Sequence, residues 1–334
     1  MDTTVSRIIN KALDGGVLTA KEGVELLSWN DVSDEASAVR LAGRRLGERV
    51  LPKAEIHGQI GLNVGLCPKD CMFCSFAVSN KVFEEPSEEP LETVVDYVRL
   101  LEEKGANAIY LMATATYDQE QFLAYARAAA AAIKDNTPLV ANVGDFDYDY
   151  ARELKKAGFV GAYHVIRMGE GTFTRCTVEQ RWATIHAAQE AGLLLGSCVE
   201  PVGPEHTLEE IVEKTIITRE MNAQFSGSMR RTPISSSELA RHGTVGYARM
   251  STIVAAVSLI AGEGIRGNCT HEPNQLAAFS GANLLWAEVG SNPRDVEGKT
   301  EENRGWTVPR CKELFEECGW EVLEGPSALF SVEA

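Results

Sequence analysis

Three closely spaced cysteines are the clearest sign of chemistry in this sequence. Cys67, Cys71 and Cys74 follow the spacing C-x3-C-x2-C. Eight cysteines in 334 residues are too few for a disulfide scaffold, so the cluster indicates metal ligation in a reducing compartment. Three thiolates would hold an iron–sulfur cluster and leave one iron without a protein ligand. Such an open coordination site is what a metal centre needs in order to bind a substrate.

A zinc knuckle or a fortuitous triplet is the alternative interpretation of these cysteines. Zinc sites usually pair one C-x2-C unit with a second pair of ligands, and no nearby Cys or His supplies that pair. A purely structural cluster would favour a fourth ligand. We therefore predict a catalytic iron–sulfur centre on this segment.

The segment Cys67–Cys74, with an aromatic Phe73 before the last cysteine, resembles the signature of the radical S-adenosylmethionine (SAM) superfamily. The resemblance implies a 4Fe–4S cluster whose open iron chelates SAM, with Phe73 among the cofactor contacts. An electron from the cluster, supplied by a reductant such as ferredoxin or flavodoxin, then cleaves SAM. The products are methionine and a 5′-deoxyadenosyl radical that abstracts hydrogen from a substrate.

Two later segments, Thr177–Trp182 and Ala191–Glu205, resemble the biotin synthase-like group of this superfamily. Its relatives include the two-component lipoyl synthases, the hydrogenase maturase and methylornithine synthase. The likeness to biotin synthase is incomplete, because the second and third predicted strands carry none of the cysteines that hold a second cluster in that enzyme. Cys198 and Cys269 lie near the family's remaining ligand positions, so they are candidate ligands of a second cluster. Small buried hydrophobic residues are the alternative.

The other cysteines are expected outside the barrel lumen. Cys176 falls on a loop, and Cys311 and Cys318 share one helix face. Packing is their commonest role, and ligation of a distant second cluster is the alternative.

Further cofactor contacts are expected at strand ends. Thr114 stands where the superfamily usually has a Gly-Gly-Glu-like turn, whose glycines and acid are absent here. Arg167 resembles the basic residue that relatives direct at the methionine carboxylate. Glu200 shares a strand face with Cys198, since side chains alternate with period two. His164 is a further candidate, with a hydrogen-bonded core histidine as the alternative.

The predicted substrate contacts are polar residues at the ends of the sixth and seventh strands. Arg230 and Arg231 would bind a substrate carboxylate through planar guanidinium groups, or else form a solvated, salt-bridged loop. Arg266, Asn268 and His271 have little reason to be there for packing alone. The expected substrate is a small, carboxylate-bearing molecule, free or bound to a carrier.

Short apolar runs alternating with helical patterns must position these residues. The predicted strands cover 56–64, 107–112, 138–143, 161–166, 193–198, 224–230, 264–269 and 283–288. This pattern predicts an α/β fold, a closed or nearly closed (β/α)8 TIM-type barrel with active residues at the carboxyl ends of its strands. We expect a helical N-terminal extension over 1–50, the barrel over 51–290 and a C-terminal cap over 291–334.

The composition restricts the partners. The formal net charge of -16 repels phosphate backbones and anionic lipid, which argues against nucleic acid and membranes. No basic leader or long apolar run is present, so we expect a soluble cytoplasmic protein.

Three functions remain in view. The first is radical SAM chemistry in cofactor biosynthesis, with sulfur insertion of the biotin or lipoyl type favoured by the strand cysteines. The second keeps the radical in a single-cluster enzyme for rearrangement or metal-cofactor maturation. The third is a non-catalytic iron–sulfur protein. A partner subunit is compatible with each.

Overall fold

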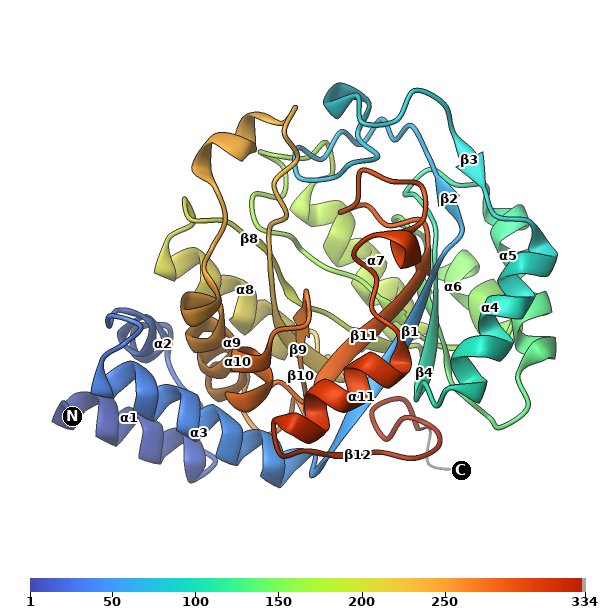
Figure 1. The fold of residues 1–334 in the computed structure, drawn as a ribbon. Helices are drawn as coiled ribbons and strands as arrows, with labels where there is room; N and C mark the ends of the chain where they lie inside the picture. Colours follow the sequence, from blue (N-terminus) through green and yellow to red (C-terminus); the bar gives the residue numbers. More distant parts are fainter. Residues whose placement is uncertain (332–334) are drawn as a thin grey trace.

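The computed structural model describes residues 1–331 and shows a helical N-terminal segment packed on a closed barrel (Figure 1). The segment contains α1 (Thr3–Leu13), α2 (Ala20–Leu27) and α3 (Asp34–Val50). Asp2, Thr19 and Ser33 cap them, each side chain accepting from backbone amides of the first turn.

The barrel closes through parallel strand pairs, as the sequence predicts. Within residues 1–331 the ring of hydrogen-bonded strands closes because β9 pairs with β10 on one side and with β7 and β8 on the other. Strands β7 and β8 together form the fifth position of the ring, so the ring has eight positions. The strands of the ring are β1 (Lys53–Gly61), β4 (Ala108–Met112), β5 (Leu139–Asn142), β6 (Phe159–Tyr163), β7 (Leu194–Gly196), β8 (Val199–Val202), β9 (Phe225–Arg230), β10 (Gly267–His271) and β11 (Leu284–Gly290). The predicted (β/α)8 fold is confirmed.

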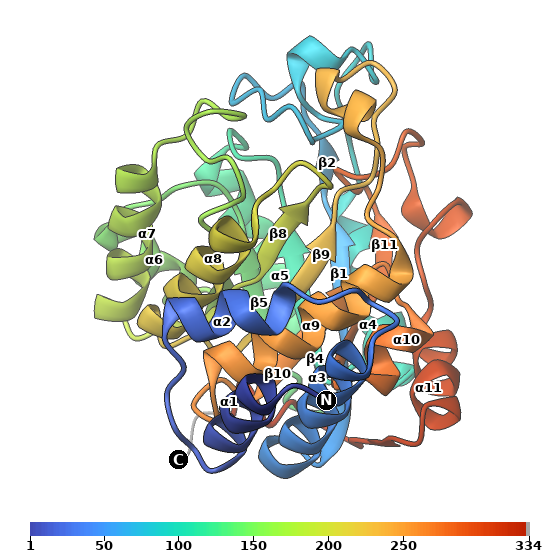
Figure 2. The same cartoon turned by 90° about the vertical axis from the view of Figure 1, so that its left-hand side faces the viewer.

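Helices surround the ring and alternate with its strands (Figure 2). They are α4 (Leu91–Glu103), α5 (Gln119–Ala132), α6 (Tyr148–Lys156), α7 (Val178–Glu190), α8 (Leu208–Glu220), α9 (Tyr247–Ala261), α10 (Gln275–Phe279) and α11 (Val308–Glu317). Short 3-10 turns occupy 78–80, 238–242 and 300–302, and three two-residue strands are β2 (Asn63–Val64), β3 (Ser87–Glu88) and β12 (Glu321–Val322). No helix in residues 1–331 is both long and apolar enough to cross a membrane.

Two barrel strands differ from the sequence expectation, since β10 begins at Gly267, three residues later than predicted, and the fifth strand is interrupted. The fifth barrel strand is broken at Ser197 and Cys198 into β7 and β8, and the chain continues as strand to Val202. Helix α9 lacks an amphipathic pattern, because Met250–Ala261 is buried on every side. It is sandwiched between the barrel and α3, where Gly43 lies so close that an added Cβ would be 2.7 Å from the Ala255 Cβ.

The C-terminal segment fills the end of the barrel opposite the cysteine loop. Leu329 and Phe330 are buried in one apolar cluster with Tyr110 and Phe225. The Ser327 amide donates to the Asn107 carbonyl at the start of β4, which ties this segment to the amino ends of the strands. The proposed cap over 291–334 therefore includes a plug at this end, and its last residues, 332–334, lie outside the described residues.

Replacing Phe330 should destabilise the barrel. We expect Phe330→Ala to lower the free energy of unfolding by about 3–5 kcal/mol, because it leaves a cavity among buried rings. Urea denaturation would measure the change. The control is Phe279→Ala, whose side chain is 68% exposed. Equal effects of the two substitutions would contradict the plug.

Candidate active site

A pocket opens at the carboxyl ends of the barrel strands and includes the lumen beneath them. It is lined by Cys67, Cys71 and Cys74 from the loop after β1 and by residues from the ends of most other strands. This is the end of a (β/α)8 barrel at which active sites are expected.

The cysteine loop is folded around a buried amide. Asn80, which is 3% exposed, donates from Nδ2 to the backbone carbonyls of Met72 (3.2 Å) and Cys74 (2.8 Å). The Cys67 amide donates to the Phe76 carbonyl at 2.7 Å, and Asp70 adopts a left-handed conformation with φ 55°. The three thiols are thereby fixed at the pocket wall.

The chemistry of these thiols fits an iron–sulfur cluster. Burial raises the pKa of Cys67, and it raises the pKa of Cys74 to about 12. Such thiols ionise when a bound metal supplies positive charge. No group of three His, Cys, Asp or Glu side chains in residues 1–331 converges on a point suited to one ion.

Cys176 lies on a loop, as expected, and that loop brings it to the wall of this pocket. Its pKa is lowered to about 7, first because the Cys71 thiol donates a hydrogen bond to it, and also because Arg181 is near. Its loop, between β6 and α7, returns to the cysteine loop: the Arg175 amide donates to the Lys69 carbonyl at 2.8 Å. That return depends on the tertiary fold and leaves no local sequence signal.

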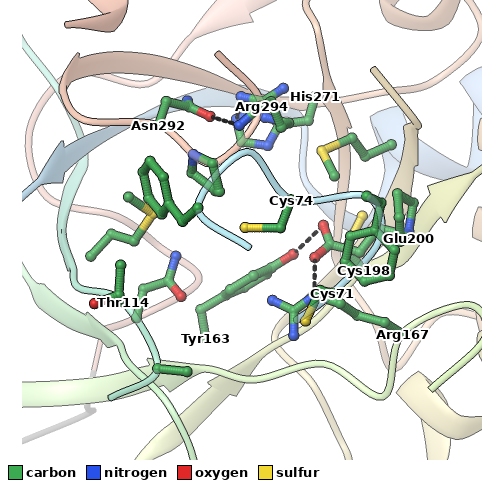
Figure 3. Close-up of a pocket in the computed structure, with 18 of the residues that line it drawn as sticks. Cys71, Cys74, Thr114, Tyr163, Arg167, Cys198, Glu200, His271, Asn292 and Arg294 are labelled. Atoms are coloured by element: carbon green, nitrogen blue, oxygen red, sulfur yellow. Dashed lines mark hydrogen bonds and ion pairs between the residues drawn. The ribbon is translucent and has the colours of Figure 1, made fainter. Parts of the chain in front are cut away.

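On one side of the pocket the predicted cofactor contact Glu200 links a second predicted contact, Arg167, with Tyr163 (Figure 3). Glu200 accepts from the Tyr163 hydroxyl at 2.7 Å, and its Oε1 lies 3.4 Å from Arg167 Nε. Burial lowers the pKa of Arg167, but Glu200 and Glu170 outweigh burial and raise it above the usual value. Arg167 thus stays charged at the pocket wall, where it can meet an anion.

A second buried carboxylate, Glu288, holds the predicted contact His271 together with Asn292 and Arg294, two pocket residues that the sequence analysis did not identify. The three residues lie together in Figure 3. Glu288 accepts from Arg294 Nη2 at 2.8 Å to each oxygen and from Asn292 Nδ2 at 2.8 Å, and it lies 3.1 Å from His271 Nε2. Burial lowers the pKa of His271. Arg294 Nη1 is buried without a hydrogen bond, its distance to Glu272 Oε1 being 3.9 Å. Arg294 lines the pocket, and its Nη1 makes no hydrogen bond within the described residues.

The predicted contacts Phe73, Thr114 and His271 line the pocket, and so do Cys198 and Cys269. Thr114 exchanges hydrogen bonds with the Asn63 side chain, its amide donating at 3.0 Å and its hydroxyl accepting at 2.9 Å. The turn that lacks the usual glycines and acid is therefore held by a neighbouring amide.

Two of the remaining predicted residues are turned away from the lumen by the geometry of β10. Arg266 precedes the strand and donates to the Ala328 carbonyl at 2.7 Å, at the opposite end of the barrel. Asn268 donates to the Val254 and Gly281 carbonyls at 3.2 and 3.1 Å, toward α9. Alternation along the strand directs Cys269 and His271 inward instead. The expected substrate contacts of Arg266 and Asn268 are corrected accordingly.

Three further predicted residues lie outside the pocket wall. His164 is buried with Nε2 3.2 Å from Asp145 Oδ1, which agrees with the alternative of a core histidine. Arg231 pairs with Glu205 and donates to the Leu239 carbonyl, so it stabilises a loop. Arg230 is at the rim, where it donates to Glu272 at 3.2 Å.

Comparison with known proteins identifies the family. Residues 64–215 match the family model of the radical SAM superfamily. This part of the chain is a radical SAM domain. The expected family is confirmed, and a radical SAM domain implies a 4Fe–4S cluster and SAM.

Curated relatives of the radical SAM domain include biotin synthases. That of Mycobacterium avium is 26% identical over 171 residues, 48% of each chain. That of Carboxydothermus hydrogenoformans is 24% identical over 250 residues, 72% of this chain and 76% of the relative. The chain thus matches about half the length of the first and three quarters of the second.

Solved structures with the same fold include the FeFe-hydrogenase maturase HydG from Carboxydothermus hydrogenoformans, with TM-score 0.77, 16% identity, and coverage of 98% of this chain and 80% of that one. Methylornithine synthase (PylB) has TM-score 0.77 and 14% identity, and the match covers 95% of this chain and 97% of that one. At these identities the likeness establishes the fold.

The buried Glu288 carboxylate should make stability depend on pH. Arg294 and His271 outweigh burial and lower its pKa from 4.5 to about 2. Its folded-state pKa is depressed, so its contribution is complete above pH 4.5 and is lost toward pH 2. We expect Glu288→Gln to cost roughly 3 kcal/mol at neutral pH and progressively less on acidification. Urea unfolding across this range would measure it. Exposed Glu321→Gln is the control, and a pH-independent difference for Glu288→Gln would contradict the assignment.

Proposed function

We propose that this protein cleaves SAM reductively at a cluster on Cys67, Cys71 and Cys74 and abstracts hydrogen from a small carboxylate-bearing substrate in the barrel lumen. The observation that carries the proposal is that three thiols of a radical SAM domain share one pocket with basic and polar side chains from the strand ends. When bound, the cluster would pass one electron to SAM for the cleavage. A low-potential reductant of the ferredoxin or flavodoxin class is the proposed source of the electron that the cluster passes on.

The pocket wall suits anionic groups although the whole chain is acidic. Lys69, Arg167, Arg181 and Arg294 line it, against one acidic side chain, Glu200. Local positive charge in a low-dielectric cleft concentrates anions even when the net charge is negative. Arg167 beside the cysteine loop is the proposed partner of the SAM carboxylate, and Thr114 and Phe73 are proposed to contact the same cofactor.

Arg294 is the proposed partner of the substrate carboxylate. Its Nη2 is held by Glu288, and this fixes the plane of the guanidinium. Its Nη1 makes no hydrogen bond and lies 3.9 Å from Glu272 Oε1, and the side chain, 8% exposed, lines the pocket. A buried donor without a partner is costly, so a ligand oxygen there would relieve that cost. His271, in contact with the same carboxylate, completes this wall.

Single-cluster chemistry, meaning rearrangement or metal-cofactor maturation, is the reaction class that the lumen favours. Sulfur insertion of the biotin or lipoyl type is the second candidate, supported by the biotin synthase relatives and by thiols in the lumen. Beyond the cysteine loop, the described pocket contains Cys176, which lies beside Cys71, and the strand cysteines Cys198 and Cys269. The two strand cysteines are half of the four thiolates that a cluster commonly takes.

Removal of the cysteine loop's thiols tests the function. We expect the anaerobically reconstituted and reduced wild type to form 5′-deoxyadenosine from SAM and to contain the iron of at least one 4Fe–4S cluster. The Cys67/Cys71/Cys74→Ser variant should form no 5′-deoxyadenosine and lose that cluster. Cys311→Ser, a buried cysteine outside the pocket, is the control. Cluster-loaded wild type that leaves SAM intact would refute the proposal.

Arg294 can be tested before the substrate is known. We expect short-chain carboxylic acids to raise the thermal midpoint of the SAM-bound protein more than their amides do. Arg294→Lys should remove this difference, because lysine keeps a charge near Glu288 but lacks the second donor of the fork. Arg310→Lys, whose guanidinium stacks 3.9 Å from the Trp306 ring centroid outside the pocket, is the control. An unchanged difference in Arg294→Lys would exclude Arg294 as the carboxylate partner.

A further inference from the structure

Two thiols that neither the cluster loop nor the proposed anion contacts use lie together in the lumen. Cys198, at the break in the fifth barrel strand, and Cys269, on β10, have sulfurs 3.6 Å apart. They are 3% and 2% exposed, and both line the pocket that the cysteine loop covers (Figure 3). A radical formed in that pocket would share its cavity with this pair.

The surroundings of the pair suit a dithiol and not a second cluster. The second- and third-strand residues in the same buried cluster are Ala108, Tyr110 and Val140, which offer no sulfur. Phe225 packs beside them, with its ring centroid 6.0 Å from that of Tyr163 and 5.9 Å from that of Trp286. These packed rings occupy the lumen beside the two sulfurs and leave the pair short of ligands for a cluster.

We propose that the Cys198–Cys269 pair donates a hydrogen atom to a carbon radical in the lumen. The S–H bond is weaker than most C–H bonds, so transfer from a thiol to an alkyl radical is downhill. In the step the S–H bond breaks homolytically, a C–H bond forms on the substrate carbon, and the unpaired electron remains on sulfur. The neighbouring sulfur at 3.6 Å is close enough to share that electron.

One electron and one proton then restore the thiol. The electron comes from the same class of low-potential one-electron donor that reduces the cluster, and the proton comes from solvent. Burial and the neighbouring Cys269 thiol raise the pKa of Cys198, so that sulfur carries its hydrogen at neutral pH. This inference rests on the proposed function and refines it: the product radical receives hydrogen, as in a rearrangement or epimerisation, and no sulfur is lost.

Deuterium transfer to the adenosyl group tests the pair without a known substrate. Protein reconstituted in D2O is given SAM and dithionite alone, and the 5′-deoxyadenosine formed is analysed by mass spectrometry. With no substrate present, the exchanged thiols of Cys198 and Cys269 offer weak bonds to hydrogen in the lumen. We expect the wild type to give deuterated product and Cys198→Ser, Cys269→Ser or the double variant to reduce the deuterated fraction severalfold. Serine preserves the size of the side chain, but its O–H bond is too strong to donate.

Two controls separate the possible failures. Cys318→Ser, a cysteine outside the pocket, should leave the label unchanged. Iron analysis of the double variant should match the wild type; a loss of iron would overturn the inference in favour of a second cluster. Equal labelling in wild type and double variant would also overturn it while leaving the proposed function intact. Absence of any 5′-deoxyadenosine from wild type would instead refute the proposed function.

Discussion

Close backbone contact between the first and last barrel strands is the constraint on which the site depends. A Cβ on Gly61 would lie 1.7 Å from the Ser291 carbonyl oxygen, and Gly290, at φ +75°, would place one 2.3 Å from the Gly61 oxygen. Only glycines allow β1 and β11 to meet so closely at their carboxyl ends. The cysteine loop and the Asn292–Arg294 loop therefore start side by side, and the Ser75 amide joins them by donating to the Pro293 carbonyl at 2.8 Å.

The sequence predicts those parts of the site that depend on the spacing of neighbouring residues. The cysteine spacing is local, and strand alternation correctly directs Cys198 and Glu200 to the same pocket. The same alternation, applied strictly, would have separated Asn268 from Cys269, which are adjacent and face opposite sides of β10. Arg266 was misplaced because the start of β10 falls three residues later than predicted, and a basic residue at the amino end of a strand cannot reach the site.

The rest of the site depends on contacts between distant segments. Arg294 looks like any surface arginine in the sequence, and its role emerges only when β10 and β11 bring His271 to within 3.1 Å of Glu288. Cys176 reaches Cys71 because its loop hydrogen-bonds to the cysteine loop. The sequence of helix α9 shows no amphipathic pattern, because complete burial removes the polar face by which a helix is recognised.

The packed end of the barrel opposite the cysteine loop affects the order in which molecules can bind. Phe330 and Tyr110 fill it with rings, and His57 there is hydrogen-bonded to Glu55 at 2.8 Å, so molecules reach the lumen from the side of the cysteine loop. A chamber entered from one side imposes an order on its occupants. A molecule that rests beneath the loop must arrive before the one seated at the loop and must wait for it to leave. In such a chamber, an excess of the molecule that binds at the cysteine loop slows turnover, because it prevents the molecule beneath it from leaving.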